Sequence, residues 1–350
     1  MTSVAETYRA PPSERSEGVW LTAWRRLKSD RIGMASLAVV GGFLVMILAA
    51  ALGLVAGDWQ KEVGVPDAPP SFVGPRPPAS ATDPIASAIP KDAKPVDLSD
   101  IDPLAPKYKE WAERAAKIQI TEPARAETLP FGADRLGRDV LSKVVKGAEV
   151  SIFVGVFAAV LATLIGTVLG AVAGYVGGRV GDFLEWVYNV FTSIPGILLI
   201  FAFAAVLGRG ISTVILILGL AGWTGIYRLV RAEYIKHRTR EYVRAAEAIG
   251  ASHFSRMFGH ILPNVSHVVL VQLSLYVVFF IKAEVILSFL GLGVRVDQVS
   301  WGTMLSEAQA ELVLGHWWQL VATTISMALF VTAFSLLTDA LRDALDPKLR

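Results

Sequence analysis

The chain consists of long apolar stretches separated by polar segments, and the length of each apolar stretch predicts an element. A helix needs roughly 20 mostly apolar residues to cross a hydrocarbon core of about 30 Å. Six stretches of this kind predict membrane-spanning helices at residues 33–57, 148–176, 185–208, 211–230, 264–292 and 317–339. Because unpaired backbone amides are costly in lipid, these segments must be helical, and the predicted fold class is an all-α membrane protein.

The first stretch follows a basic lead, as the apolar part of a cleaved signal peptide does. However, 32 residues precede it, and its apolar run is longer than that of an ordinary signal peptide. We therefore interpret residues 33–57 as a retained span.

The basic residues that flank the spans and indicate their orientation lie in the N-terminal segment 1–32, in the segment 231–263 and at the C-terminus. Such residues are enriched on the cytoplasmic side of a membrane. Six spans put all three places on one side, whereas five or seven spans would divide them. We therefore expect both termini in the cytoplasm and a membrane-spanning core at 147–350.

The segment 58–146 then lies outside the cytoplasm, and most of the 18 prolines fall between Pro66 and Pro130. This composition favours coil or polyproline conformation. One amphipathic stretch with Tyr108 and Trp111 at helical spacing is the exception. The segment is either a packing arm or a contact surface for a delivery protein, and composition alone favours the first interpretation. At its end we expect Arg138 and Asp139 to form a structural ion pair, with a substrate role as the alternative.

Composition narrows the function classes. Mean hydropathy is +0.50 and only 18% of residues are charged, whereas a soluble chain is nearer a quarter. A net charge of +2 gives no support for nucleic-acid binding, and the absence of cysteine excludes disulfides, thiolate metal sites and cysteine nucleophiles. No phosphate-binding G-x-x-x-x-G-K-[ST] motif occurs. We predict no catalytic residue, metal site or cofactor on this chain.

The segment 238–263 predicts two short helices. The stretch 240–249 is rich in helix formers, and Gly250 is a good helix stop. Ser252 can cap a second helix, which we expect to end before Pro263. On the first helix one face carries small and apolar side chains that a groove on another protein could accept. This face consists of Tyr242, Ala245, Ala246 and Ile249.

This loop resembles the cytoplasmic loop of importer permeases of the ATP-binding-cassette superfamily. That loop has a Glu-Ala-Ala core, a following glycine and a hydrophobic-x-Leu-Pro end. The matching residues are Ala245, Ala246, Gly250, Leu262 and Pro263. The chain departs from the general pattern at Arg244 and His260, and both departures resemble the dipeptide and oligopeptide branch. Segments 132–142, 290–293, 301–305 and 339–350 also resemble the second permease of that branch, the DppC/OppC type.

The resemblance implies a type I permease fold: six transmembrane helices with a cytoplasmic coupling helix between spans four and five. It implies a bacterial inner membrane, a homologous second permease subunit and a periplasmic or lipoprotein substrate-binding protein. Two ATPase subunits would bind ATP and Mg. The cargo would be di- or oligopeptides, with nickel complexes, haem, glutathione and peptide antibiotics as alternatives. The residues expected to dock the ATPase are Glu241, Tyr242, Arg244, Ala245, Ala246, Gly250, Leu262 and Pro263.

The second predicted span carries four glycines at intervals of four: Gly166, Gly170, Gly174 and Gly178. On a helix they form one stripe that allows close approach of a neighbouring backbone. The stripe is a static packing seam or a sliding one, and spacing does not distinguish them.

Glu284 is the one acid deep in an apolar segment, and such acids are functional hypotheses by default. A rise of about 1.5 Å per residue from Pro263 places it roughly 30 Å along the helix, near the outer boundary. There we expect it to reach water or pair with a neighbour. Lys282 lies on a different face. Two roles remain open: translocation path or gate, and packing.

Two other classes of membrane protein agree less well with the sequence. A secondary transporter complete in one chain should show paired intramembrane acids or broken helices in repeated halves. A membrane anchor for an enzyme complex would not need the docking loop. One acid, no evident repeat and the loop favour the permease subunit.

Overall fold

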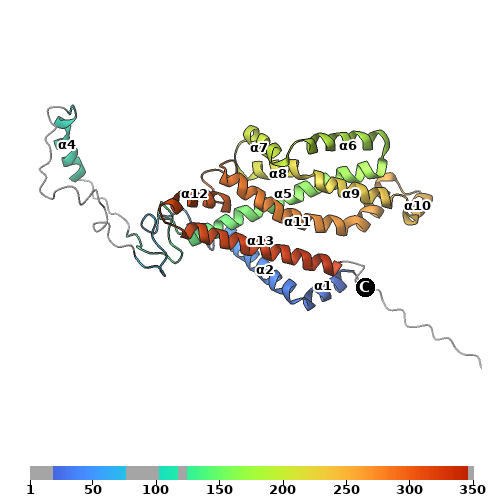
Figure 1. Ribbon diagram of the computed structural model, residues 1–350, viewed down its shortest axis with the longest axis horizontal. Coiled ribbons are helices and arrows are strands. Elements are labelled where there is room, and N and C mark those ends of the chain that lie inside the picture. The colour runs from blue at the N-terminus through green and yellow to red at the C-terminus, as the bar shows by residue number, and fades with distance from the viewer. Residues whose placement is uncertain (1–18, 76–101, 117–123, 346–350) are drawn as a thin grey trace, which may run out of the picture. The chain divides into compact units, whose positions relative to one another are not determined.

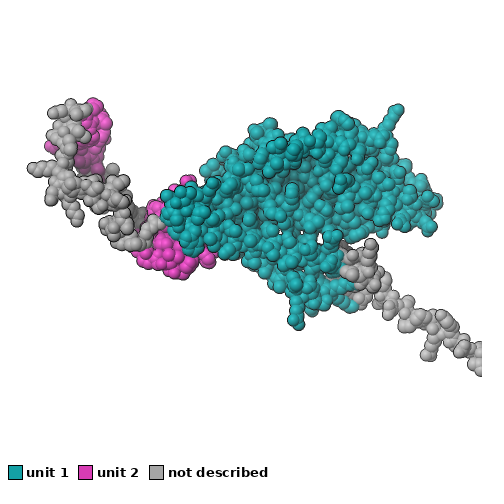
Figure 2. Space-filling view, in the orientation of Figure 1, with its two compact units in different colours: residues 1–59, 142–350 teal, residues 60–141 magenta. Residues whose placement is uncertain are grey.

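The computed structural model describes residues 19–75, 102–116 and 124–345 (Figure 1). Within these ranges the chain is helical, and its only β-structure is isolated bridges. The prediction of an all-α membrane protein is therefore confirmed. The chain divides into two compact units, residues 60–141 and the remainder (Figure 2).

Four helical segments of the larger unit are long and apolar enough to cross a membrane. They are α2 (Arg31–Ala51), α5 (Val140–Val176), η2 with α11 (Ser255–Phe289) and α13 (Trp318–Leu345). The first span is shorter than the predicted 33–57, because the chain turns at Gly53, which has a φ of 72°. α5 begins at Val140 rather than at residue 148.

The third predicted span is not one straight helix. α6 (Gly178–Ser193) and α7 (Gly196–Leu207) meet at 88°. Pro195 lies in the break, and Ile194 before it is extended, as residues before proline usually are. The fourth span is bent too, by 44° between α8 (Ile211–Gly222) and α9 (Thr224–His237). The described residues contain six spans if each bent pair counts as one.

The spans of the larger unit pack side by side, as Figure 1 shows for α5, α11, α13 and α2. α13 contacts α2 and α1 (Val19–Ser29), and α11 contacts α8, α9, α12 (Trp301–Val313) and α13. Buried side chains from these helices form one core, among them Val154, Leu218, Phe280, Trp301 and Phe330. The short helix α10 (Glu241–Ala248) lies at one end of this bundle and α12 at the other (Figure 1).

Three of the four glycines in the predicted stripe bring α5 against α9. A Cβ added at Gly166 would lie 1.9 Å from Ile226 Cγ2, and one at Gly170 would lie 2.7 Å from the Tyr227 carbonyl oxygen. At Gly174 it would lie 2.6 Å from the carbonyl oxygen of Arg231, about one helical turn further along α9. Only glycine fits these positions, because the two backbones are almost in contact.

Gly178 does not belong to this seam. It follows the end of α5, has a φ of +53°, and a Cβ added there would meet nothing within 4 Å. The regular spacing placed it on the stripe, but α5 ends at Val176 and the chain turns at Gly177.

The smaller unit is held by contacts between segments that are far apart in the sequence. Isolated bridges join Gly64 to Ala126 and Pro70 to Leu129. Arg138 forms an ion pair of 2.6 Å with Asp134, which is fully buried. Arg138 thus takes part in a structural ion pair as expected, with Asp134 as the acid where the sequence had singled out Asp139. The amphipathic stretch forms the helix α4 (Ala105–Ala116).

We predict that Gly170→Val destabilises the protein by about 1–3 kcal/mol, because the added atoms overlap the α9 backbone. The matched control is Gly42→Val in α2, where a Cβ meets nothing within 4 Å. Thermal unfolding of both purified variants, followed by size-exclusion fluorescence, measures the difference. Equal unfolding midpoints for the two variants would contradict the assignment of the seam.

Candidate functional site

The segment 238–263, which the sequence predicts to form two short helices, connects α9 to α11. Arg240 is extended, α10 begins at Glu241, and Gly250 ends it with a φ of +86° that favours glycine. Ser252 Oγ accepts a hydrogen bond of 3.2 Å from the Ser255 amide, so it starts the second helical segment as expected.

The second segment does not end before Pro263. It is a π-helix, η2 (Ser255–Ile261), that continues directly into α11 (Leu262–Phe289) with Pro263 in the first turn. A proline inside a continuous helix lacks an N–H and crowds the preceding turn, and the wider π-helical turns before Pro263 accommodate it. The loop therefore joins the fifth span without a flexible break.

One side of α10 packs against the rest of the protein. Val243 is 3% exposed and Ala246 is 4% exposed. Val243 belongs to a buried cluster with Tyr234, Met257 and Ile261, and the Tyr234 hydroxyl donates a hydrogen bond to the Met257 carbonyl. Ala246 therefore lies on the inner face, whereas the sequence placed it on the free face with Ala245.

The opposite side of α10 is free within the described residues. Tyr242 and Ala245 are exposed, and Ile249 is 84% exposed. Phe254, just beyond the turn, is 71% exposed. An apolar group displayed this openly at the end of a helical bundle is typical of a protein–protein contact.

Polar contacts fix α10 to its neighbours. Arg256 Nη1 lies 2.7 Å from Glu247 Oε1, and Arg256 also contacts His253. The Tyr242 hydroxyl and His237 Nδ1 share a hydrogen bond of 2.8 Å. Burial raises the pKa of Tyr242, so the hydroxyl keeps its proton at neutral pH. These contacts hold α10, η2 and the end of α9 together as one rigid body.

Glu284 is fully buried rather than accessible to water near the boundary. The Ser288 hydroxyl donates a hydrogen bond of 2.6 Å to Glu284 Oε1, and the hydroxyls of Ser151 and Ser300 approach the same carboxyl. Ser151 Oγ in turn accepts the amide of Trp301 at 3.1 Å. The carboxyl group thus lies at the N-terminus of α12, where the helix dipole favours an acid.

The result is a polar cluster that links α5, α11 and α12. Glu284 does not pair with Lys282, which is exposed, in agreement with their different faces. A role of Glu284 at a gate stays a prediction.

A second buried cluster was missed by sequence reasoning. The fully buried Lys143 of α5 donates hydrogen bonds to Glu307 of α12 at 2.6 Å and to Gln319 of α13 at 3.1 Å. Lys143 lay in the predicted extracytoplasmic segment 58–146. A prediction that the second span begins before Lys143 would have placed this lysine on the helix and could have identified the cluster.

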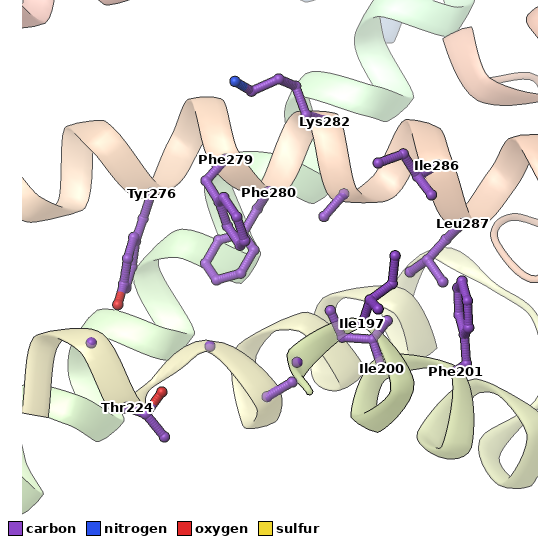
Figure 3. Close-up of a pocket in the computed structure, with 15 residues that line it drawn as sticks. Ile197, Ile200, Phe201, Thr224, Tyr276, Phe279, Phe280, Lys282, Ile286 and Leu287 are labelled. Carbon is purple, nitrogen blue, oxygen red and sulfur yellow. The ribbon is translucent and has the colours of Figure 1, made fainter. Parts of the chain in front are cut away.

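A cavity of about 590 Å³ lies between α7, the bend of α8 and α9, and α11 (Figure 3). Its walls are mostly apolar, with Ile200, Phe201 and Leu287 among them. The Tyr276 hydroxyl accepts a hydrogen bond of 3.1 Å from the Ile226 amide, which satisfies a backbone group at the bend. Among the described residues, no group of three or more histidine or acidic side chains is placed to hold a metal ion.

Apolar spans, two bent helix pairs and a short helix with an exposed apolar face between the fourth and fifth spans are the features of a polytopic membrane protein. The family described as "Binding-protein-dependent transport system inner membrane component" matches residues 166–350, more than half of the chain. The chain belongs to this family.

Individual relatives agree with this assignment. The dipeptide transport system permease protein DppC of Bacillus subtilis is 40% identical over 220 residues, which are 63% of this chain and 69% of that protein. The oligopeptide transport system permease protein OppC of the same organism is 38% identical, over 63% of this chain and 72% of that protein. The glutathione transport system permease protein GsiD of Salmonella typhimurium is 41% identical with the same coverage.

The resemblance to permeases of the dipeptide and oligopeptide type is thereby confirmed. The protein is a multi-pass permease component of the inner membrane.

We predict that Glu284→Ala lowers the free energy of unfolding by about 2–4 kcal/mol, because it leaves a cavity and unpaired buried hydroxyls. Glu284→Gln keeps the volume and an acceptor oxygen, so its effect should be clearly smaller. The control Glu113→Ala removes an exposed acid from α4 and should be neutral. Denaturation midpoints of the three purified variants test this, and a neutral Glu284→Ala would refute a packing role.

Proposed function

We propose that this chain is one of two permease subunits of an ATP-driven importer that takes up di- or oligopeptides. The observation that carries the proposal is the exposed face of α10, formed by Tyr242, Ala245 and Ile249 on a helix fixed rigidly to two spans. Relatives named for dipeptide and oligopeptide transport support the choice of cargo.

The proposed partners follow from the phosphate-binding motif that the sequence lacks and from the helix face that α10 exposes. Its sequence has no phosphate-binding loop, so two separate ATPase subunits would bind ATP and Mg, and this chain would be non-catalytic with no cofactor of its own. A homologous second permease would complete the pore. A periplasmic or lipoprotein substrate-binding protein would deliver the cargo.

Both termini would face the cytoplasm together with α10. In Figure 1, α1, α10 and the C-terminal end of α13 lie at the same end of the larger unit. This end also carries Arg25, Arg26 and Lys28, as expected for the cytoplasmic side.

Coupling would use the rigid connection between α10 and the spans. Closure of the ATPase subunits displaces α10, and Val243 and Arg256 transmit the displacement to η2 and α11. α11 moves as one body with η2 because no break separates them. The near-contact of α5 and α9 at Gly166 and Gly170 allows small relative shifts of two smooth surfaces.

Glutathione is a second candidate cargo. The support is the 41% identity to the glutathione transport system permease protein GsiD. Glutathione is itself a small peptide, so the same pore chemistry would serve it.

The docking face predicts a specific phenotype. Ala245→Trp should reduce uptake of radiolabelled dialanine at least about tenfold, because a bulky side chain keeps α10 out of a groove that accepts a small one. Membrane insertion and stability should be unchanged, since Ala245 is exposed. Ala245→Ser is the matched control and should transport normally. Wild-type uptake by Ala245→Trp would exclude this face as the docking site.

The cargo can be tested without mutation. The purified complex, with its ATPase subunits and the binding protein encoded alongside, should hydrolyse ATP faster when the binding protein is loaded with a peptide. Dialanine, trialanine and glutathione distinguish the candidates. No stimulation by any of the three would refute a peptide cargo.

A further inference from the structure

Lys282 is a charged residue in the fifth span that the proposed coupling does not use. It lies on α11, is exposed, and forms no ion pair or hydrogen bond with any described residue. Exposed positions recur every three or four residues along the same helix, at Leu275, Phe279, Lys282 and Ile286. Lys282 therefore belongs to an exposed stripe of α11, and Phe279, Lys282 and Ile286 of this stripe also border the cavity beside α7 and the bend of α8 and α9.

The position of Lys282 is poorly suited to escape from the membrane. It precedes the end of α11 at Phe289 by seven residues, about 10 Å at 1.5 Å per residue. In Figure 3 its side chain leaves α11 on the side away from Thr224 and Ile200, and it leans back toward Tyr276. This direction follows from the tilt of helical side chains toward the N-terminus, and it takes the ammonium group deeper into the span rather than out of it.

An ammonium group at this depth needs water and an anion, because hydrocarbon solvates neither charge nor N–H groups. Among the described residues, no anion lies within ion-pair distance of it. Glu284, the only acid within α11, is fully buried on another face and bonded to Ser288. The exposed stripe therefore faces an aqueous path, and the counter-charge comes from another molecule.

We propose that Lys282 lies on the translocation path and binds acidic side chains of the passing peptide. The inference rests on the proposed function. The carboxylates of acidic side chains in dipeptides and oligopeptides, the cargoes for which two relatives are named, are ionised at neutral pH. A lysine suits a transient contact, because its flexible stem presents a point charge without the bidentate geometry that would hold a carboxylate tightly.

The test compares Lys282→Met, Lys282→Arg and wild type in the complete complex, expressed in cells that lack other peptide importers. Lys282→Met keeps the length of the side chain and removes the charge, and Lys282→Arg keeps the charge. Lys28→Met removes an exposed lysine from α1 and serves as the control. The probes are the radiolabelled dipeptides Ala-Glu and Ala-Lys, which differ by two units of side-chain charge.

We expect Lys282→Met to lower the ratio of Ala-Glu to Ala-Lys uptake about tenfold, the effect of one lost charge-assisted hydrogen bond. The preference of the binding protein cancels, because every variant uses the same one. Lys282→Arg and Lys28→Met should keep the wild-type ratio, and ATP hydrolysis stimulated by the binding protein should be unchanged in all variants.

Three results would overturn the inference. An unchanged ratio in Lys282→Met means that the charge does not contact cargo. An equal loss for both dipeptides means a structural defect. Loss of the second permease from the purified Lys282→Met complex means that Lys282 pairs with that subunit. If wild type takes up neither dipeptide, the proposed function itself fails, which is a separate outcome.

Discussion

A buried polar group in this protein must find its partner within the protein, because a membrane offers none. This requirement makes every span helical, and it also determines how the spans depart from ideal helices. At the bend between α8 and α9 the Ile226 amide is taken by the Tyr276 hydroxyl of α11. Glu284 is accommodated in the same way, by the Ser288 hydroxyl and the start of α12. The contact of Tyr276 with Ile226 joins α11 to α9, and the position of Glu284 at the start of α12 joins α11 to α12.

The same requirement explains why the loop between the fourth and fifth spans can work as a rigid lever. α10 is held on its inner face by Val243 and Ala246 and at its end by the ion pair of Glu247 with Arg256. η2 then passes into α11 through wide turns that tolerate Pro263. The packing of Val243 and the ion pair of Glu247 with Arg256 tie α10 to η2 across the turn at Gly250, so a displacement applied to the exposed face of α10 is carried into the fifth span.

Different helix faces have different roles: one face of α5 allows close packing, and two faces of α11 keep opposite charges apart. On α5, Gly166, Gly170 and Gly174 let α9 approach so closely that a Cβ at any of these positions would overlap atoms of α9. On α11, the buried face carries Glu284 and the exposed face carries Lys282. A helix that keeps one charge inside the subunit and exposes the opposite charge is suited to form a wall between a packed core and a polar path.

The sequence by itself determined the fold class, the number of apolar segments, and the place of the loop with its stop at Gly250 and its cap at Ser252. These depend on local properties: the length of an apolar run, backbone freedom and capping. Only the tertiary structure decided that Ala246 faces inward, that Gly178 lies outside the seam, and that the third span is bent at Pro195. Only the fold, too, brought Lys143 to Glu307 and Glu284 to Ser300, because such pairs join residues distant in the chain. Periodicity tells which residues share a helical face, but what covers that face depends on neighbours that no local pattern specifies.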